Sequence, residues 1–119
     1  MRRLVIALNC VASSVATLAA PVALAASAPP AVTVVLKDHR FAPSVIQVAA
    51  GQKVRIRLIN QDAASEEFDS RDLDVEEDVT PRGETSFEIG PLKPGRYNFM
   101  GEFHAQTAQG EVVAASTSR

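Results

Sequence analysis

Residues 53–59 constrain the fold more than any other segment, because charged and apolar side chains alternate along them. Val54, Ile56 and Leu58 would face one side of an extended chain, and the charged residues between them would face the other. This period of two predicts a β-strand with one buried face and argues against an amphipathic helix.

The same pattern recurs at intervals along the chain. We expect strands at 32–37, 45–48, 53–59, 85–89, 96–100 and 111–115, the last two forming an antiparallel pair. Turn residues separate them, namely Phe41-Ala42-Pro43, Asn60-Gln61-Asp62, Pro81-Arg82-Gly83 and the run from Gly90 to Gly95. Residues 63–80 hold eight acidic residues and no sustained apolar period, so we expect a long connection with one short strand. The spacing predicts an all-β sandwich or barrel of about seven strands.

The N-terminus is typical of a secretory signal peptide. Arg2 and Arg3 precede an apolar or small-residue run over 4–24, and Ala23-Leu24-Ala25 offers a cleavage site. We therefore expect residues 1–25 to be a signal peptide, 26–31 a linker and 32–119 a single domain. A membrane anchor is the alternative, but the small residues, Pro21 and the cleavage site favour removal.

The only cysteine, Cys10, lies in the segment that we expect to be removed. The processed chain would then have no disulfide, no zinc–thiolate site, no iron–sulfur cluster and no copper–thiolate centre. Its 94 residues, from 26 to 119, carry 10 basic and 14 acidic side chains, a net charge near −4. Scattered basic residues and few aromatic ones argue against nucleic-acid binding. The negative net charge suits a cationic ligand or partner.

Residues 97–110 are the main candidate for a functional site, because they read as a final hairpin with His104 on its loop. A histidine there supplies an imidazole that copper, iron and zinc all accept. An acidic cluster, Glu66-Glu67-Phe68-Asp69, lies upstream. Together these segments predict a site built from imidazole and carboxylate.

The mature chain resembles the cupredoxins along nearly its whole length. The resemblance rests on Phe41-x-Pro43, Val45-x-x-Val48-x-x-Gly51-x-x-Val54, Asn60-x-Asp62 and Gly95-x-Tyr97-x-Phe99 leading to His104 and Gly110. It implies a cupredoxin-like Greek-key β-sandwich. A blue-copper protein would have cysteine near Gly101 and methionine shortly before Gly110, and both sulfurs are missing here.

A narrower resemblance is to the cysteine-less cupredoxin-like proteins of bacterial periplasmic iron-uptake systems. It rests on Glu66-Glu67-Phe68-Asp69-Ser70 with Asp72-Leu73, Gly101-Glu102-Phe103-His104 and Thr107-Ala108-Gln109-Gly110. It implies a periplasmic protein that binds copper, or iron, and serves an inner-membrane ferrous-iron permease. Copper-dependent oxidation of Fe(II) and hand-over of metal to the permease both fit it, and a metal-free interaction module is the alternative.

The expected metal ligands differ in how well the residues support them. His104 is the first, and Glu102, two residues earlier, would point to the same side if the chain stays extended. Adjacent residues of a strand face opposite ways, so only one of Glu66 and Glu67 can point inward. We favour Glu67, beside Phe68, and keep Glu66 as the alternative.

Three further residues complete the expectations. Asp69 shares the parity of Glu67 and is a further oxygen donor. Met100 offers a thioether, although it can equally be a packing residue. His39, after the first strand, is expected to be a surface histidine. Imidazole and carboxylate suit Cu(II), Fe(II), Fe(III) or Zn(II), and intrinsic affinity places Cu(II) first.

Overall fold

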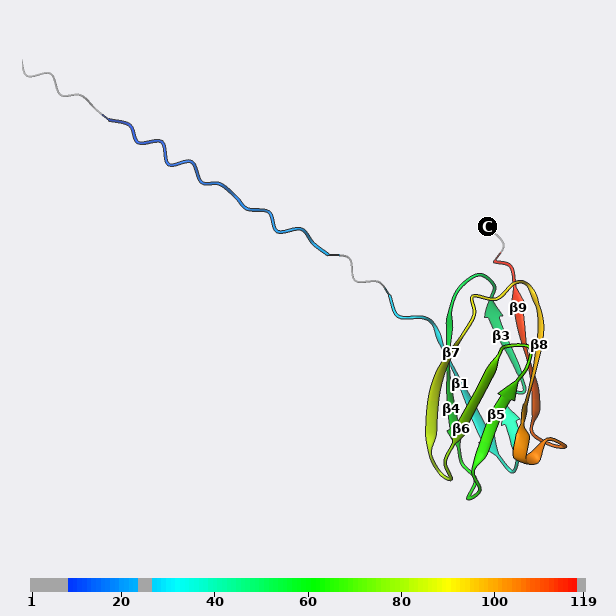
Figure 1. Cartoon of the computed structure of the whole chain (residues 1–119). Helices are drawn as coiled ribbons and strands as arrows, with labels where there is room; N and C mark the ends of the chain where they lie inside the picture. The colour runs from blue at the N-terminus through cyan, green and yellow to red at the C-terminus, as the bar shows by residue number, and fades with distance from the viewer. Residues whose placement is uncertain (1–8, 24–26, 118–119) are drawn as a thin grey trace, which may run out of the picture.

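Two β-sheets packed face to face form the folded part of the chain (Figure 1). This computed structural model describes residues 9–23 and 27–117. Within those ranges the elements are β1 (Ala31–Lys37), β2 (Arg40–Ala42), β3 (Val45–Ala49), β4 (Val54–Asn60), β5 (Glu66–Ser70), β6 (Val75–Val79), β7 (Glu84–Ile89), β8 (Gly95–Gly101), the short 3-10 helix η1 (Glu102–His104) and β9 (Gln109–Ala115).

The sheets contain four and five strands, in the orders β2-β1-β4-β7 and β3-β9-β8-β5-β6. Strand β1 runs parallel to β4, and β3 runs parallel to β9, whereas the other pairs are antiparallel. The parallel pairs join strands that are distant in sequence, so the chain crosses between the two sheets. The all-β sandwich predicted from the sequence is confirmed.

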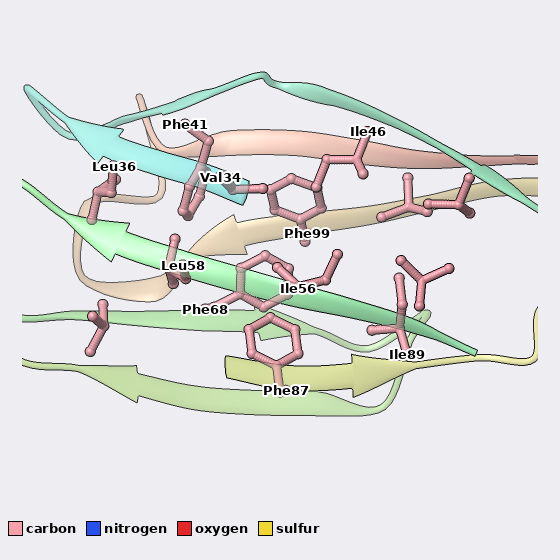
Figure 2. Close-up of a cluster of buried hydrophobic side chains, with 14 of the residues drawn as sticks. Val34, Leu36, Phe41, Ile46, Ile56, Leu58, Phe68, Phe87, Ile89 and Phe99 are labelled. Atoms are coloured by element: carbon pink, nitrogen blue, oxygen red, sulfur yellow. The ribbon is translucent and has the colours of Figure 1, made fainter. Parts of the chain in front are cut away.

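The core lies between the sheets and is built from the inward side of each alternating strand. Val54, Ile56 and Leu58 of β4 are buried, as their alternation predicts. Phe68 of β5 is fully buried, and its ring centroid lies 4.6 Å from that of Phe99. The rings of Phe87 and Phe41 lie 4.8 Å and 5.9 Å from Phe68, so a cluster of aromatic rings joins the two sheets (Figure 2).

The expected long connection over residues 63–80 is wrong in part, because the structure forms two strands there, β5 and β6, paired as an antiparallel hairpin. Apolar periodicity does not mark β5, because Phe68 lies between two buried polar residues, Glu66 and Ser70. The Phe41-Ala42-Pro43 segment, expected to be a break, also contributes the short strand β2. The described residues therefore form nine strands rather than about seven.

The N-terminal segment is extended and exposed over residues 9–23. Arg2, Arg3 and the predicted cleavage after Ala25 lie outside the described residues, and the signal peptide stays a prediction. Over the ranges 9–23 and 27–117, no helix has the length and apolar character needed to cross a bilayer. Strand β1 begins at Ala31, one residue before the predicted domain boundary.

We expect Phe68→Ala to destabilise the fold by about 3–5 kcal/mol, since it removes the ring that contacts both sheets and leaves a cavity. Phe103→Ala is the matched control, because Phe103 is 53% exposed and its loss should change stability by no more than about 0.5 kcal/mol. Urea unfolding of both variants measures the difference. Similar midpoints for the two would contradict the assignment of Phe68 to the centre of the core.

Candidate functional site

The candidate site lies at one end of the sandwich, where several strands end or begin. Strands β1 and β4 run parallel, so both finish at this end, and β8 ends there because it runs antiparallel to β5. Helix η1 follows β8 and carries His104, and in Figure 1 it lies at the end of the sandwich away from the end of β9. The chain thus brings four separate segments to one place.

Glu66 is the buried charged residue at the centre of this site, with 1% of its surface exposed. Its Oε1 accepts hydrogen bonds from the backbone N–H groups of Phe103, at 2.8 Å, and Glu67, at 3.1 Å. Its Oε2 lies 2.5 Å from Nδ1 of His104. A buried carboxylate needs such partners, because an unpaired buried charge destabilises a fold by several kcal/mol, on the order of 3–5 kcal/mol. Glu66 therefore fixes both the backbone of η1 and the imidazole of His104.

Gly101 leaves the space that Glu66 occupies. A Cβ atom at this position would lie 2.7 Å from Cδ of Glu66 and 2.8 Å from Cβ of Ala108. Both distances are too short for unstrained contact. Because a blue-copper protein would have its thiolate near Gly101, the carboxylate here fills the volume that such a side chain would need.

His39 lies at the same end of the sandwich, although we expected it to be a surface histidine outside the site. Its ring stacks on that of His104, with centroids 3.6 Å apart and planes 11° apart. The side chain is 43% exposed, but its Nδ1 atom is buried and has no hydrogen-bond partner among the described residues. The expected lone surface histidine is therefore one half of a histidine pair.

Asp62, just after β4, holds the turn that carries His39. Its two carboxylate oxygens accept the backbone N–H groups of Asp38, at 2.8 Å, and His39, at 3.0 Å. Burial alone would raise the pKa of Asp62. The two hydrogen bonds, together with the charges of His39 and Arg82, lower that pKa below its ordinary value. Asp62 is thus kept ionised beside the His39 ring, with Oδ2 3.5 Å from Nδ1.

A second group of acidic residues lies on the other face of β5 and β6. Glu67 and Asp69 alternate with the inward residues of β5, and in the strand register they stand opposite Asp78 and Glu76. Like charges directly across two strands repel. Glu102 completes this group, which we call the outer acidic face, because its carboxyl and that of Glu67 form a hydrogen bond when one of the two is protonated.

Burial, the hydrogen bond with Glu102 and the charges of Glu102, Asp78 and Glu76 raise the pKa of Glu67 to about 6. Met100 lies nearby on β8 and is 42% exposed. It lines a hollow of about 420 Å³ together with Asp69, Asp72 and Glu102. The outer acidic face therefore borders an open groove rather than an enclosed site.

The structure divides the six predicted ligands into two groups. Glu66 and His104 meet inside the sandwich end, whereas Glu67, Asp69, Met100 and Glu102 lie on or beside the outer acidic face. The preference for Glu67 as the inward carboxylate is wrong, because Glu66 shares the parity of buried Phe68. The expected extended path from Glu102 to His104 is also wrong, because these residues form the 3-10 helix η1. Metal binding by these side chains remains a prediction.

The donor atoms at the inner group suit some metals and not others. Within residues 9–23 and 27–117, no three His, Cys, Asp or Glu side chains are arranged to hold an ion as the site stands. A copper–thiolate centre does not fit, since Gly101 and Ala108 occupy this region without sulfur. A nitrogen donor is present, because His104 is 27% exposed and its Nδ1 contact with Glu66 leaves Nε2 available.

We expect Glu67→Gln to stabilise the metal-free protein at about pH 7.5 and to have little effect at about pH 4.5. The raised pKa of about 6 means that the folded state holds the proton more tightly than the unfolded state. The stability that Glu67 contributes is therefore present below its unfolded pKa and is lost as pH rises through about 6. Thermal unfolding of parent and variant in chelator measures it. Equal stabilisation at both pH values would contradict this electrostatic explanation.

Comparison with known proteins supports the fold. A model of the cupredoxin-like domain matches residues 5–114. A protein of Rickettsia prowazekii (strain Madrid E) is 40% identical over 82 residues, which cover 69% of this chain and 66% of that protein's length.

Three solved structures share the fold at low sequence identity. Auracyanin A, a blue copper protein of Chloroflexus aurantiacus, is 15% identical, with a TM-score of 0.64 over 74% of this chain and 100% of its own. The metal-binding domain of a Cu(I)-exporting P-type ATPase of Streptococcus pneumoniae D39, solved with Cu(I), is also 15% identical, with a TM-score of 0.64 over 72% of this chain and 85% of its own. The purple cupredoxin of Nitrosopumilus maritimus is 16% identical, with a TM-score of 0.54 over 70% and 98% of the two chains. With the family match extending across both sheets and the site, the chain belongs to the cupredoxin-like domain family.

Proposed function

We propose that this chain is a periplasmic cupredoxin-like protein that binds copper or iron without a thiolate and assists ferrous-iron uptake. The observation that carries the proposal is the buried Glu66 carboxylate held against His104, at the end of the sandwich where the loop histidine lies. A buried carboxylate against one ring nitrogen, with the other ring nitrogen available, is the usual arrangement around a metal-binding histidine.

His104 supplies the central donor in this proposal. Its Nδ1 contacts Glu66, so Nε2 is the nitrogen that would bind the metal. Histidines that bind metals usually donate their other ring N–H to a carboxylate or carbonyl, which fixes the ring and makes it a stronger ligand. Glu66 has this orienting role here, because moving it onto a metal would leave the N–H groups of Phe103 and Glu67 without their acceptor.

The donor chemistry favours a borderline divalent cation. Imidazole nitrogen and carboxylate oxygen accept Cu(II), Fe(II) and Zn(II), and Cu(II) binds most tightly in the usual order of affinities. Two of the solved structures that share the fold are a blue copper protein and a domain solved with Cu(I), which supports copper as the class of metal. Because no sulfur donor is present at this site, the copper would be of a different type from that of a blue copper protein.

The surroundings of the site support a role in moving cations. The outer acidic face lies next to η1 and would raise the local concentration of Fe(II). The partly exposed imidazole of His104 permits ligand exchange. We therefore propose hand-over of metal to an inner-membrane iron permease as the main role. Oxidation is the other route, in which one electron passes from Fe(II) to bound Cu(II) and yields Fe(III) and Cu(I).

The test is calorimetric titration of Cu(II) into the protein and two adjacent isosteric variants. We expect Glu66→Gln to weaken binding about tenfold or more, since it removes the charge that orients His104, and Glu67→Gln to bind like the parent. His104→Ala should weaken binding at least as much. The copper-loaded protein should lack the intense visible band that a copper–thiolate bond produces.

Glu67→Gln acting more strongly than Glu66→Gln would move the site to the outer acidic face. No specific copper or iron binding by the parent would overturn the proposal and favour the metal-free interaction module. Mixing copper-loaded protein with Fe(II) in the absence of oxygen distinguishes the two roles, because oxidation forms Fe(III) and Cu(I) in equal amounts.

A further inference from the structure

We propose that His39 is a second imidazole donor to the metal at His104, and that Asp62 is the residue that positions it. This inference rests on the proposed metal-binding function. It extends the site to a segment that carries no recognisable metal-binding motif. Four observations lead to it, each from a different part of the geometry.

The backbone around His39 forms a tight two-residue hairpin turn. Lys37 of β1 pairs with Arg40 of β2, so Asp38 and His39 are the two residues of a hairpin turn. Their φ angles are +51° and +56°, in the left-handed region that glycine and asparagine tolerate best. A two-residue hairpin turn needs positive φ at both central residues, and histidine is one of the side chains that tolerate it. The tight turn therefore leaves the His39 ring little choice of position.

Asp62 supplies the bonds that hold this turn. It reaches the turn because β1 and β4 are parallel neighbours that end side by side, and Gln61 N–H donates to the carbonyl of Leu36 at 2.8 Å. The carboxylate then accepts the N–H groups of both turn residues. Asp62 is itself fixed, since its own N–H donates to Oδ1 of buried Asn60 at 2.9 Å. The turn between β1 and β2 is thus anchored to the buried end of the neighbouring strand β4.

The anchored turn places the ring of His39 against that of His104. With the centroids 3.6 Å apart, the two rings are in contact over their faces. Parallel rings present parallel lone pairs, so a shared ion requires the rings to tilt until two nitrogens converge. Both side chains reach solvent, with 43% of His39 and 27% of His104 exposed.

The two rings share the same arrangement of partners. Nδ1 of His104 lies against the Glu66 carboxylate, and Nδ1 of His39 lies 3.5 Å from Asp62 Oδ2 without a completed hydrogen bond. A buried polar atom without a partner is uncommon and points to a group that completes its bonding in another state. Metal at Nε2 would strengthen Nδ1–H as a donor and favour that missing bond to Asp62. Each imidazole would then have one carboxylate behind it.

The test counts nitrogen donors in the Cu(II)-loaded protein by electron paramagnetic resonance. We expect two equatorial imidazole nitrogens in the parent and one in His39→Gly, with Cu(II) affinity lowered about tenfold. Glycine suits the left-handed turn, so this variant should keep the fold and its thermal stability while losing the donor. His39→Asn, which also tolerates the turn, is the second variant. Arg40→Ala, at an exposed position of β2, is the control that should bind like the parent.

Asp62→Ala tests the positioning role. It should weaken Cu(II) binding in the parent and have no further effect in His39→Gly, because its influence passes through His39. Equal losses in both backgrounds would show a merely structural role for Asp62. Two nitrogens in His39→Gly, or one in the parent, would overturn the assignment of His39 while leaving metal binding at His104 intact. A parent that binds no copper would instead overturn the proposed function itself.

Discussion

The contact between Glu66 and His104 is the interaction on which the functional end of this molecule depends. Glu66 is buried, and a buried carboxylate is tolerated only when hydrogen bonds and a partner replace its water. One partner is the N–H of Glu67 in β5, and the other two, the N–H of Phe103 and Nδ1 of His104, come from the segment that follows β8. Gly101 makes the approach possible, since any side chain there would collide with the carboxylate. One interaction thus ties β5 to η1 and orients the ring that is available to a ligand.

The period of two along β5 gives the adjacent acidic residues separate surroundings. Glu66 faces the interior with Phe68, whereas Glu67 and Asp69 face outward toward other carboxylates. Inside, a carboxylate is satisfied by N–H groups and an imidazole. Outside, carboxylates stand opposite each other and repel, which the fold tolerates because the aromatic core stabilises the same strands. The two groups are suited to different tasks, one to orienting a donor and the other to attracting cations.

The sequence predicted the parts of the fold that hydrophobic alternation marks. Strand β4 was clear because Val54, Ile56 and Leu58 alternate with charges, and the final hairpin was clear from its turn residues. The β5–β6 hairpin was missed because its inward positions include the polar residues Glu66, Ser70 and Glu77. Apolar and polar residues therefore do not alternate there, although burial does. The parity of Glu66 with Phe68 would have identified the inward carboxylate. His39 was missed for another reason, since its position depends on the parallel pairing of β1 with β4, which local sequence does not encode.

The most direct test of this account is the position of the proton on His104 in the metal-free protein, measured by nitrogen NMR of the histidine rings at about pH 7.5. The 2.5 Å contact between Glu66 Oε2 and Nδ1 of His104 needs a proton between the two atoms. When the imidazole carries that proton on Nδ1, the Nε2 lone pair is available for a metal. We therefore expect His104 to show the Nδ1–H tautomer, and Glu66→Gln to reduce its population. A proton on Nε2 in the parent, or a ring that exchanges between tautomers like a free imidazole, would contradict the account.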